Sequence, residues 1–217
     1  MKTAASPGSR NSALRALTGK RAVAIGIGVA AIATVGAVAV GVATMGTGTG
    51  NPATGSSAGA PASTVLPPSL VEFRSPPAGF SLAYPTDWTH LQSTDPQVPL
   101  IATRGPHSFL VRVLDLPNQI GPQELAAARA LTDGIVLSDK SVKLLAQPQQ
   151  MSLAGLPGYF YFYTFTDPAT GLTGVHSHFF LFKGKTMIAL VFQAIPAEQF
   201  KDGATTFDQI TGSFRVE

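Results

Sequence analysis

The sequence contains no cysteine. A chain without cysteine has no disulfide framework, no thiolate metal site and no thiol nucleophile, and it has no cysteine to carry a bacterial lipid anchor. Acidic residues are absent from the first 71 positions, because Glu72 is the first of the twelve acids in the chain. Any membrane attachment therefore has to come from an apolar segment, and the N-terminal third carries positive charge alone.

The positive charge is concentrated at the start of the chain. Residues 22–217 hold ten basic and twelve acidic side chains, a formal charge of −2, so the high pI of about 9.3 reflects the N-terminal tail. No basic footprint remains outside that tail, and we expect no nucleic-acid partner. Five basic side chains make up the tail's charge: Lys2, Arg10, Arg15, Lys20 and Arg21.

Residues 22–45, AVAIGIGVAAIATVGAVAVGVATM, contain no charge. At about 1.5 Å per residue a helix of this length spans about 36 Å, enough to cross a hydrocarbon core of about 30 Å. Positive residues remain on the cytoplasmic side, so we expect a single-pass anchor with a cytoplasmic N-terminus. The alternative is a signal peptide cleaved near residues 43–45, although the apolar part of such peptides is normally about 7–15 residues long.

The anchor is followed by a segment of low complexity. Of the 24 residues in 46–69, 21 are Gly, Pro, Ser, Thr or Ala and none is charged, which predicts a flexible linker. Residues 70–217 are long enough to form one domain with a sizeable core. We therefore expect a basic cytoplasmic tail (1–21), a transmembrane helix (22–45), a linker (46–69) and an extracytoplasmic domain (70–217).

Strands dominate the expected secondary structure of residues 70–217. The first is expected at 79–84, and Trp88 begins the next extended stretch. A helix is expected from Pro122, with apolar residues at helical spacing as far as Ile135. A second helix is expected over 197–210, ended by Gly212. The other strands are expected at 100–103, 109–114, 142–146, 149–153, 159–165, 175–182 and 186–194, with turns at 154–158 and 167–171 and a hairpin about 183–185.

Two of these strands are apolar on both faces. Residues 159–165 read YFYFYTF and residues 179–182 read FFLF. A strand that is apolar on both faces is covered on both sides. The expected fold class is therefore α+β: a central antiparallel sheet flanked by helices on both faces, preceded by a single transmembrane helix, with Trp88 buried under one of the helices.

Three segments resemble the PsbP family. They are GFSLAYPTDW at 79–88, Leu-Pro-Gly at 156–158 and FDQITGSFRV at 207–216. The resemblance covers roughly residues 72–216 and extends to the Mog-like import factors and to actinobacterial envelope proteins. It implies an antiparallel sheet between helices and a role in binding or assembly, and it supplies no set of catalytic residues. Many bacterial relatives carry a lipidated cysteine where this chain has its apolar segment.

His176 and His178 lie two residues apart on one expected strand, so their side chains point to the same face. Neutral imidazoles in this arrangement could share a zinc ion, but the sequence offers no evident third ligand, since His90 and His107 fall in expected turns elsewhere. Ser177 points to the opposite face, which is a poor geometry for a Ser–His pair. We expect surface or half-buried histidines rather than a metal centre.

Two further features have two interpretations each. Asp87 is either the cap of a turn or an acid in a cleft, and we expect the cap. The row of tyrosines at 159, 161 and 163 is expected in the core, although tyrosine also suits an apolar groove that opens to a partner.

The sequence thus predicts no catalytic residue, no cofactor and no metal ligand. The leading hypothesis is a membrane-anchored envelope protein whose PsbP-like domain binds a protein partner or assists assembly. One alternative is a carrier of lipid or another small ligand. The other is a metal-dependent cell-wall hydrolase that uses His176 and His178.

Overall fold

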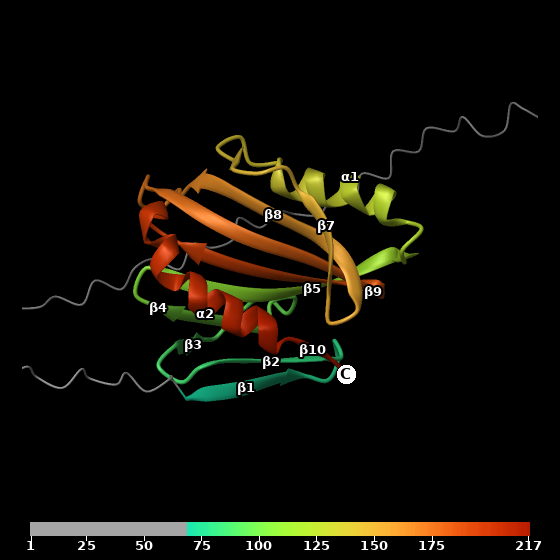
Figure 1. Cartoon of the computed structure of the whole chain (residues 1–217), viewed down its shortest axis with the longest axis horizontal. Helices are drawn as coiled ribbons and strands as arrows, with labels where there is room; N and C mark the ends of the chain where they lie inside the picture. Colours follow the sequence, from blue (N-terminus) through green and yellow to red (C-terminus); the bar gives the residue numbers. More distant parts are fainter. Residues whose placement is uncertain (1–68) are drawn as a thin grey trace, which may run out of the picture. The chain divides into compact units, whose positions relative to one another are not determined.

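The computed structural model describes residues 69–217, which form two antiparallel sheets and two α-helices (Figure 1). The expected tail (1–21), the transmembrane segment (22–45) and the linker (46–69) except its last residue lie outside the described residues. Within residues 69–217, neither α-helix combines the length and the apolar character needed to cross a bilayer.

The smaller sheet has the order β1-β2-β10, from β1 (Leu70–Ser75), β2 (Phe80–Pro85) and β10 (Arg215–Val216). β2 is the strand expected at 79–84, but it is not the first, because β1 precedes it. The prediction missed β1, most of whose residues are exposed. In its sequence LVEFRS, apolar and polar residues alternate only over residues 71–74, a run of about four and the shortest that indicates a half-buried strand.

The larger sheet has the order β3-β4-β5-β9-β8-β6, and β7 pairs with β8 beside that path. Every pairing in it is antiparallel, as expected. Its strands are β3 (Thr89–Leu91), β4 (Leu100–Arg104), β5 (His107–Ile120), β6 (Lys143–Leu144), β7 (Gln149–Leu153), β8 (Leu156–Thr166) and β9 (Thr173–Ala194).

The chain reverses direction inside β9, which confirms the expected hairpin about 183–185. The rings of Phe179 and Phe192 lie 6.0 Å apart, whereas 13 extended residues would separate them by about 43 Å. Gly184 has φ of +61°, which a two-residue type II′ turn requires at its first loop position. The arm before the turn pairs with β8 and the arm after it pairs with β5. β9 therefore supplies two neighbouring strands at the centre of the sheet.

Several boundaries differ from those expected. The turn before β8 consists only of Ala154 and Gly155, both with positive φ as in a type I′ turn, so residues 156–158 belong to the strand. The strand expected at 142–146 is reduced to the two residues of β6, at the edge of the sheet. β5 runs well beyond the expected 109–114 because the second arm of β9 pairs along it as far as a bulge between Asp115 and Ile120.

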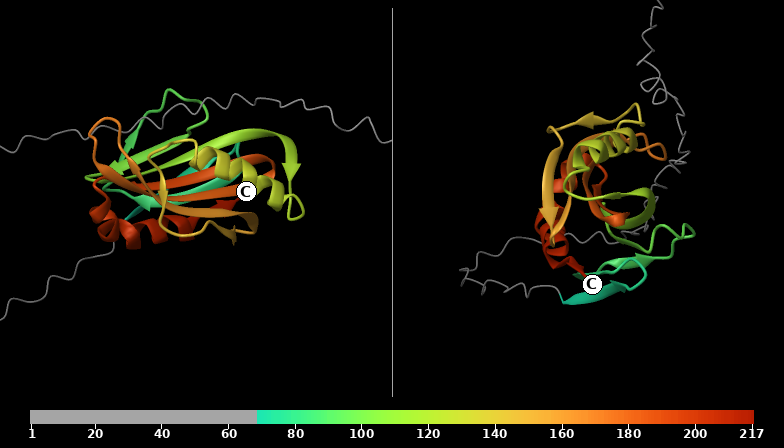
Figure 2. Two further views of the ribbon diagram at one scale, coloured as in Figure 1. Left: turned by 90° about the horizontal axis from the view of Figure 1, so that it is seen from above. Right: turned by 90° about the vertical axis from the view of Figure 1, so that its right-hand side faces the viewer.

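Two helices pack on different sides of the larger sheet (Figure 2). α1 (Leu125–Val136) packs on the tyrosines of β8, and α2 (Phe200–Ser213), after the short 3₁₀ helix η1 (Ala197–Gln199), packs between the sheet and β2. α1 begins three residues later than expected. α2 continues past Gly212, which is therefore not its stop, and the Ser213 hydroxyl bonds the carbonyl of Ile210.

Trp88 is only 6% exposed. Its ring contacts Phe109 on β5 and Phe207 on α2, with centroids 5.6 and 6.2 Å away. The expectation that Trp88 is buried under a helix is confirmed.

Candidate functional site

His176 and His178 lie on the first arm of β9, and both are only 4% exposed. The expectation of surface or half-buried histidines is therefore wrong. Their rings pack between aromatic neighbours, with His176 on Phe165 at 4.2 Å and His178 on Phe180 at 3.9 Å between centroids. The sequence signal for this burial was available, since residues 175–182 are apolar on either side of the histidines.

One tyrosine hydroxyl joins the two histidines. The Oη of Tyr163 lies 3.0 Å from Nδ1 of His176 and 3.2 Å from Nδ1 of His178. Nε2 of His176 lies 2.7 Å from Oε1 of Gln193. An amide oxygen only accepts, so this nitrogen is protonated and donates a hydrogen bond to it. We call these four residues, Tyr163, His176, His178 and Gln193, the histidine cluster.

The protonation of the other ring nitrogens in the cluster follows from the assignment of Nε2 of His176 as a donor. Because Nε2 of His176 is protonated, its Nδ1 is an acceptor and the hydroxyl of Tyr163 donates to it. Nδ1 of His178 then donates to the same hydroxyl oxygen, which leaves Nε2 of His178 as an unprotonated acceptor. That atom is buried and has no hydrogen-bond partner among residues 69–217.

Burial favours the uncharged forms throughout the cluster. It lowers the pKa of His176 to about 4, against smaller opposing effects of Gln193 and Asp139. Burial also lowers the pKa of His178, helped by the nearby His176 and Arg112. The pKa of the Tyr163 hydroxyl is raised for the same reason. The cluster is therefore neutral at pH 7.

The other candidates of the sequence do not join the cluster. His90 is exposed on β3, and His107 begins β5 with Nε2 2.8 Å from the carbonyl of Gln199, so both lie in strands rather than in turns. Ser177 is paired with Phe162, away from its flanking histidines. In the described part of the chain, no three His, Asp or Glu side chains are grouped so that they could hold a metal ion.

Asp87 is exposed and does not act as the expected turn cap. Its Oδ2 lies 2.9 Å from Nε of Arg104, at the end of β4. The carboxylate of Asp87 forms a surface ion pair with Arg104. This geometry supports neither an acid in a cleft nor a turn cap.

The three tyrosines of β8 are buried, which confirms the expectation that they lie in the core. Two of them form hydrogen bonds to α1. The Tyr159 hydroxyl donates to the carbonyl of Leu125 at 2.9 Å. The Tyr161 hydroxyl lies 2.7 Å from Oδ1 of Asp133 and 2.6 Å from Oγ1 of Thr132. All three hydroxyls of this row are therefore used inside the domain, and the row is not an open groove.

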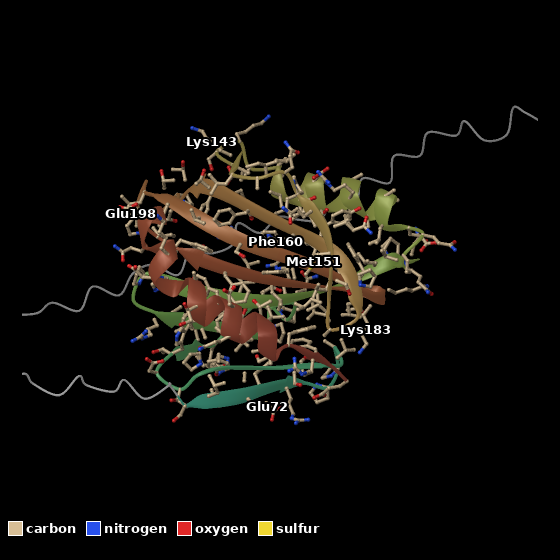
Figure 3. All side chains as sticks on the ribbon, viewed as in Figure 1. Glu72, Lys143, Met151, Phe160, Lys183 and Glu198 are labelled. Atoms are coloured by element: carbon tan, nitrogen blue, oxygen red, sulfur yellow. The ribbon has the colours of Figure 1, made fainter. Side chains whose placement is uncertain are left out.

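The apolar surface left partly open lies on the other face of β8. Phe160 alternates with the buried tyrosines and packs on Phe179 of β9, with 4.8 Å between ring centroids. Met151 and Phe160 lie on the face of the sheet between β7 and α2 (Figure 3). The members of this surface, which we call the aromatic shelf, are all half-buried: Met151, Leu153, Leu156, Phe160 and Phe179.

Sequence reasoning missed the shelf because it treated both rows of YFYFYTF alike. The pattern itself offered a signal, since the tyrosines occupy one face of the strand and the phenylalanines at 160 and 162 the other. Tyrosines reach polar groups on a covering helix, so the tyrosine row indicates the face on which α1 packs.

No family model matches the sequence, and no curated protein matches it either. Among solved structures, the cyanobacterial PsbP (CyanoP) of Synechocystis sp. PCC 6803 matches with a TM-score of 0.52 and 12% identity, over 72% of this chain and 97% of CyanoP. The fold is PsbP-like. At this level of identity the likeness concerns the fold alone.

Two further solved structures are similar at lower scores. LpqN of Mycobacterium tuberculosis, described as involved in cell envelope biogenesis, is 13% identical over 70% of this chain and 87% of LpqN, with a TM-score of 0.49. The Saccharomyces cerevisiae Ran-binding protein Mog1p is 11% identical over 69% of this chain and 96% of Mog1p, with a TM-score of 0.45.

Two of the three segments that resemble the PsbP family meet in the PsbP-like fold. Phe80 of β2 stacks on Phe214, with 5.6 Å between ring centroids, and Arg215 of β10 pairs with Ser81. Trp88 contacts Phe207 edge to face, with 6.2 Å between ring centroids. The residues at 79–88 and 207–216 are therefore neighbours in one part of the core.

Proposed function

We propose that this chain is a single-pass membrane protein of the cell envelope whose PsbP-like domain, outside the membrane, binds a protein partner and performs no catalysis. The apolar residues 22–45 and the basic residues before them support the anchor and its orientation. The aromatic shelf is the observation that carries the binding role.

The shelf has the composition of the centre of a protein interface. Aromatic residues and methionine are enriched there, and charged residues are depleted. Phe160 and Phe179 are half-buried and pack on each other, so they lose little side-chain freedom when a partner covers them. A hydrolase, by contrast, would need a polar constellation open to substrate, whereas the histidine cluster is buried.

A photo-crosslinking phenylalanine analogue at Phe160 tests this proposal in the intact protein in cells. We expect a discrete protein adduct from position 160. The same analogue at Leu137 is the control, because Leu137 is 49% exposed just after α1. Equal adducts from both positions, or none from position 160, contradict a partner on the shelf. Adducts to lipid from position 160 would instead support the carrier hypothesis.

A further inference from the structure

Among residues 69–217, β1 is an edge strand with one side unpaired. In the part of the chain that the structure describes it pairs only with β2, and it lies at the outer margin of the domain (Figure 1). Leu70 and Val71 are 51% and 38% exposed. An open strand edge offers unpaired N–H and C=O groups to any second strand of suitable register.

The hydrogen bonds between β1 and β2 show which backbone groups of β1 point away from β2. The N–H of Thr86 donates to the carbonyl of Ser69 at 2.9 Å, so residues 69, 71, 73 and 75 face β2. Leu70, Glu72 and Arg74 consequently direct their backbone groups outward. The same alternation holds on the far side of β2, where the N–H of Glu217 donates to Gly79.

We propose that β1 pairs with β1 of a second copy of this chain, antiparallel and centred on Phe73. In this register Glu72 lies opposite Arg74 of the second copy, and the two outward-facing residues exchange hydrogen bonds. Symmetry repeats the pair on the other side of the axis. Two three-stranded sheets then become one continuous sheet of six strands.

Charge selects this register over its neighbour. A register centred on Glu72 also pairs outward-facing residues, but it sets the two Glu72 carboxylates directly opposite each other, which is destabilising. In the single chain Glu72 and Arg74 already form a salt bridge at 2.8 Å, with side chains 52% and 61% exposed. Arg74 also lies 3.1 Å from Glu217, so the pairing exchanges only its Glu72 partner for Glu72 of the second copy, and the charges determine register more than affinity.

Charged residues on an edge strand ordinarily prevent pairing. Here one charge of each sign flanks Phe73, and such an arrangement is complementary to itself when the strand is reversed. Phe73 itself is half-buried against Phe80, with ring centroids 6.1 Å apart, so the two copies would meet ring to ring on the core side. The pairing does not depend on the proposed anchor, although two copies in one membrane have a raised effective concentration.

The absence of native cysteine makes a direct test possible in the full chain. In the proposed register the two Phe73 residues form a pair without mutual hydrogen bonds, with Cα atoms about 4.5 Å apart, within the range that a disulfide bridges. Phe73→Cys is expected to give a disulfide-linked dimer under mild oxidation. Leu70→Cys is the matched control, since the two copies of residue 70 lie about 20 Å apart.

Charge reversal in the Phe73→Cys background tests the register. Glu72→Arg is expected to lower the dimer yield several-fold, and adding Arg74→Glu is expected to restore it. Equal dimer yields from Phe73→Cys and Leu70→Cys, or a dimer formed by Glu72→Cys instead, overturn the proposal.

A second variant keeps Phe73 in place, in case its replacement weakens the core. Val71 and Ser75 of opposite copies are also paired in the proposed register, so Val71→Cys with Ser75→Cys is expected to link two chains. Within one chain these residues lie about 13 Å apart along the strand, too far for a bridge. A folded variant, judged by the fluorescence of Trp88, that remains monomeric contradicts the self-pairing.

Discussion

His176 and His178 show how burial determines the chemistry of a side chain. As exposed residues they would titrate near pH 6.5, but in the domain their rings lie between Phe165, Phe180 and Tyr163. Protonation would place two positive charges beside one hydroxyl and would remove the acceptor on His176 that this hydroxyl bonds. The cluster therefore requires both histidines to be neutral.

The domain is expected to lose stability in mild acid. The pKa of His176 is about 4 in the folded state and about 6.5 when unfolded. Its contribution is therefore complete above pH 6.5 and is lost as pH falls towards 4. The free energy of unfolding should drop by about 2 kcal/mol between pH 7 and pH 5 from His176 alone, and His178 acts in the same direction.

Denaturant titration at the two pH values measures this loss. His176→Gln should reduce this dependence of the unfolding free energy on pH. An unfolding free energy that is the same at pH 7 and pH 5 would show that the histidines are not held neutral.

At the scale of elements, the hairpin inside β9 positions the centre of the sheet. Its arms connect β8 to β5, and α1 and α2 pack on the faces that these strands form. The reversal depends on Gly184, whose φ of +61° is accessible to glycine at little cost. Side chains around the turn leave open space, since a Cβ at Gly184 would meet no atom within 4 Å.

Gly184→Ala isolates that backbone requirement. Because the added methyl group touches nothing, the expected loss of about 1–2 kcal/mol comes only from the positive φ. Gly134→Ala is the matched control, since its Cβ also meets open space but the residue lies in α1 with ordinary helical geometry. It should stabilise the domain by about 0.5–1 kcal/mol. Two changes of the same sign in thermal or denaturant unfolding would contradict this account of the turn.

At the scale of the whole molecule, the charge before residues 22–45 determines the expected orientation. Five basic side chains and no acid precede that segment. A single cysteine at Ser57 should therefore react with an impermeant thiol reagent in whole cells, and one at Ser9 should react only after the cells are opened. The reverse pattern would mean that the domain is cytoplasmic, and the envelope proposal would fail.

Local patterns determined much of the fold. The two-sided apolar strands at 159–165 and 179–182 predicted a covered antiparallel sheet, and Lys183-Gly184-Lys185 between apolar arms predicted the reversal in β9. Both signals lie within a few neighbouring residues, where periodicity and turn chemistry act. The resemblance at 79–88 and 207–216 also agrees with the PsbP-like fold, in which those segments form β2 and the end of the chain that packs on it.

Tertiary structure alone decided the rest. β1 is established as a strand by its pairing with β2, since the alternation in LVEFRS covers only residues 71–74. The histidines are neutral because aromatic rings from β8 and β9 exclude water, and α1 covers the tyrosine face while the phenylalanine face of β8 remains partly open. Which groups are desolvated, and which edges and faces stay free, depends on residues far apart in the chain. A sequence pattern records the character of a face, whereas its burial depends on the element that packs against it.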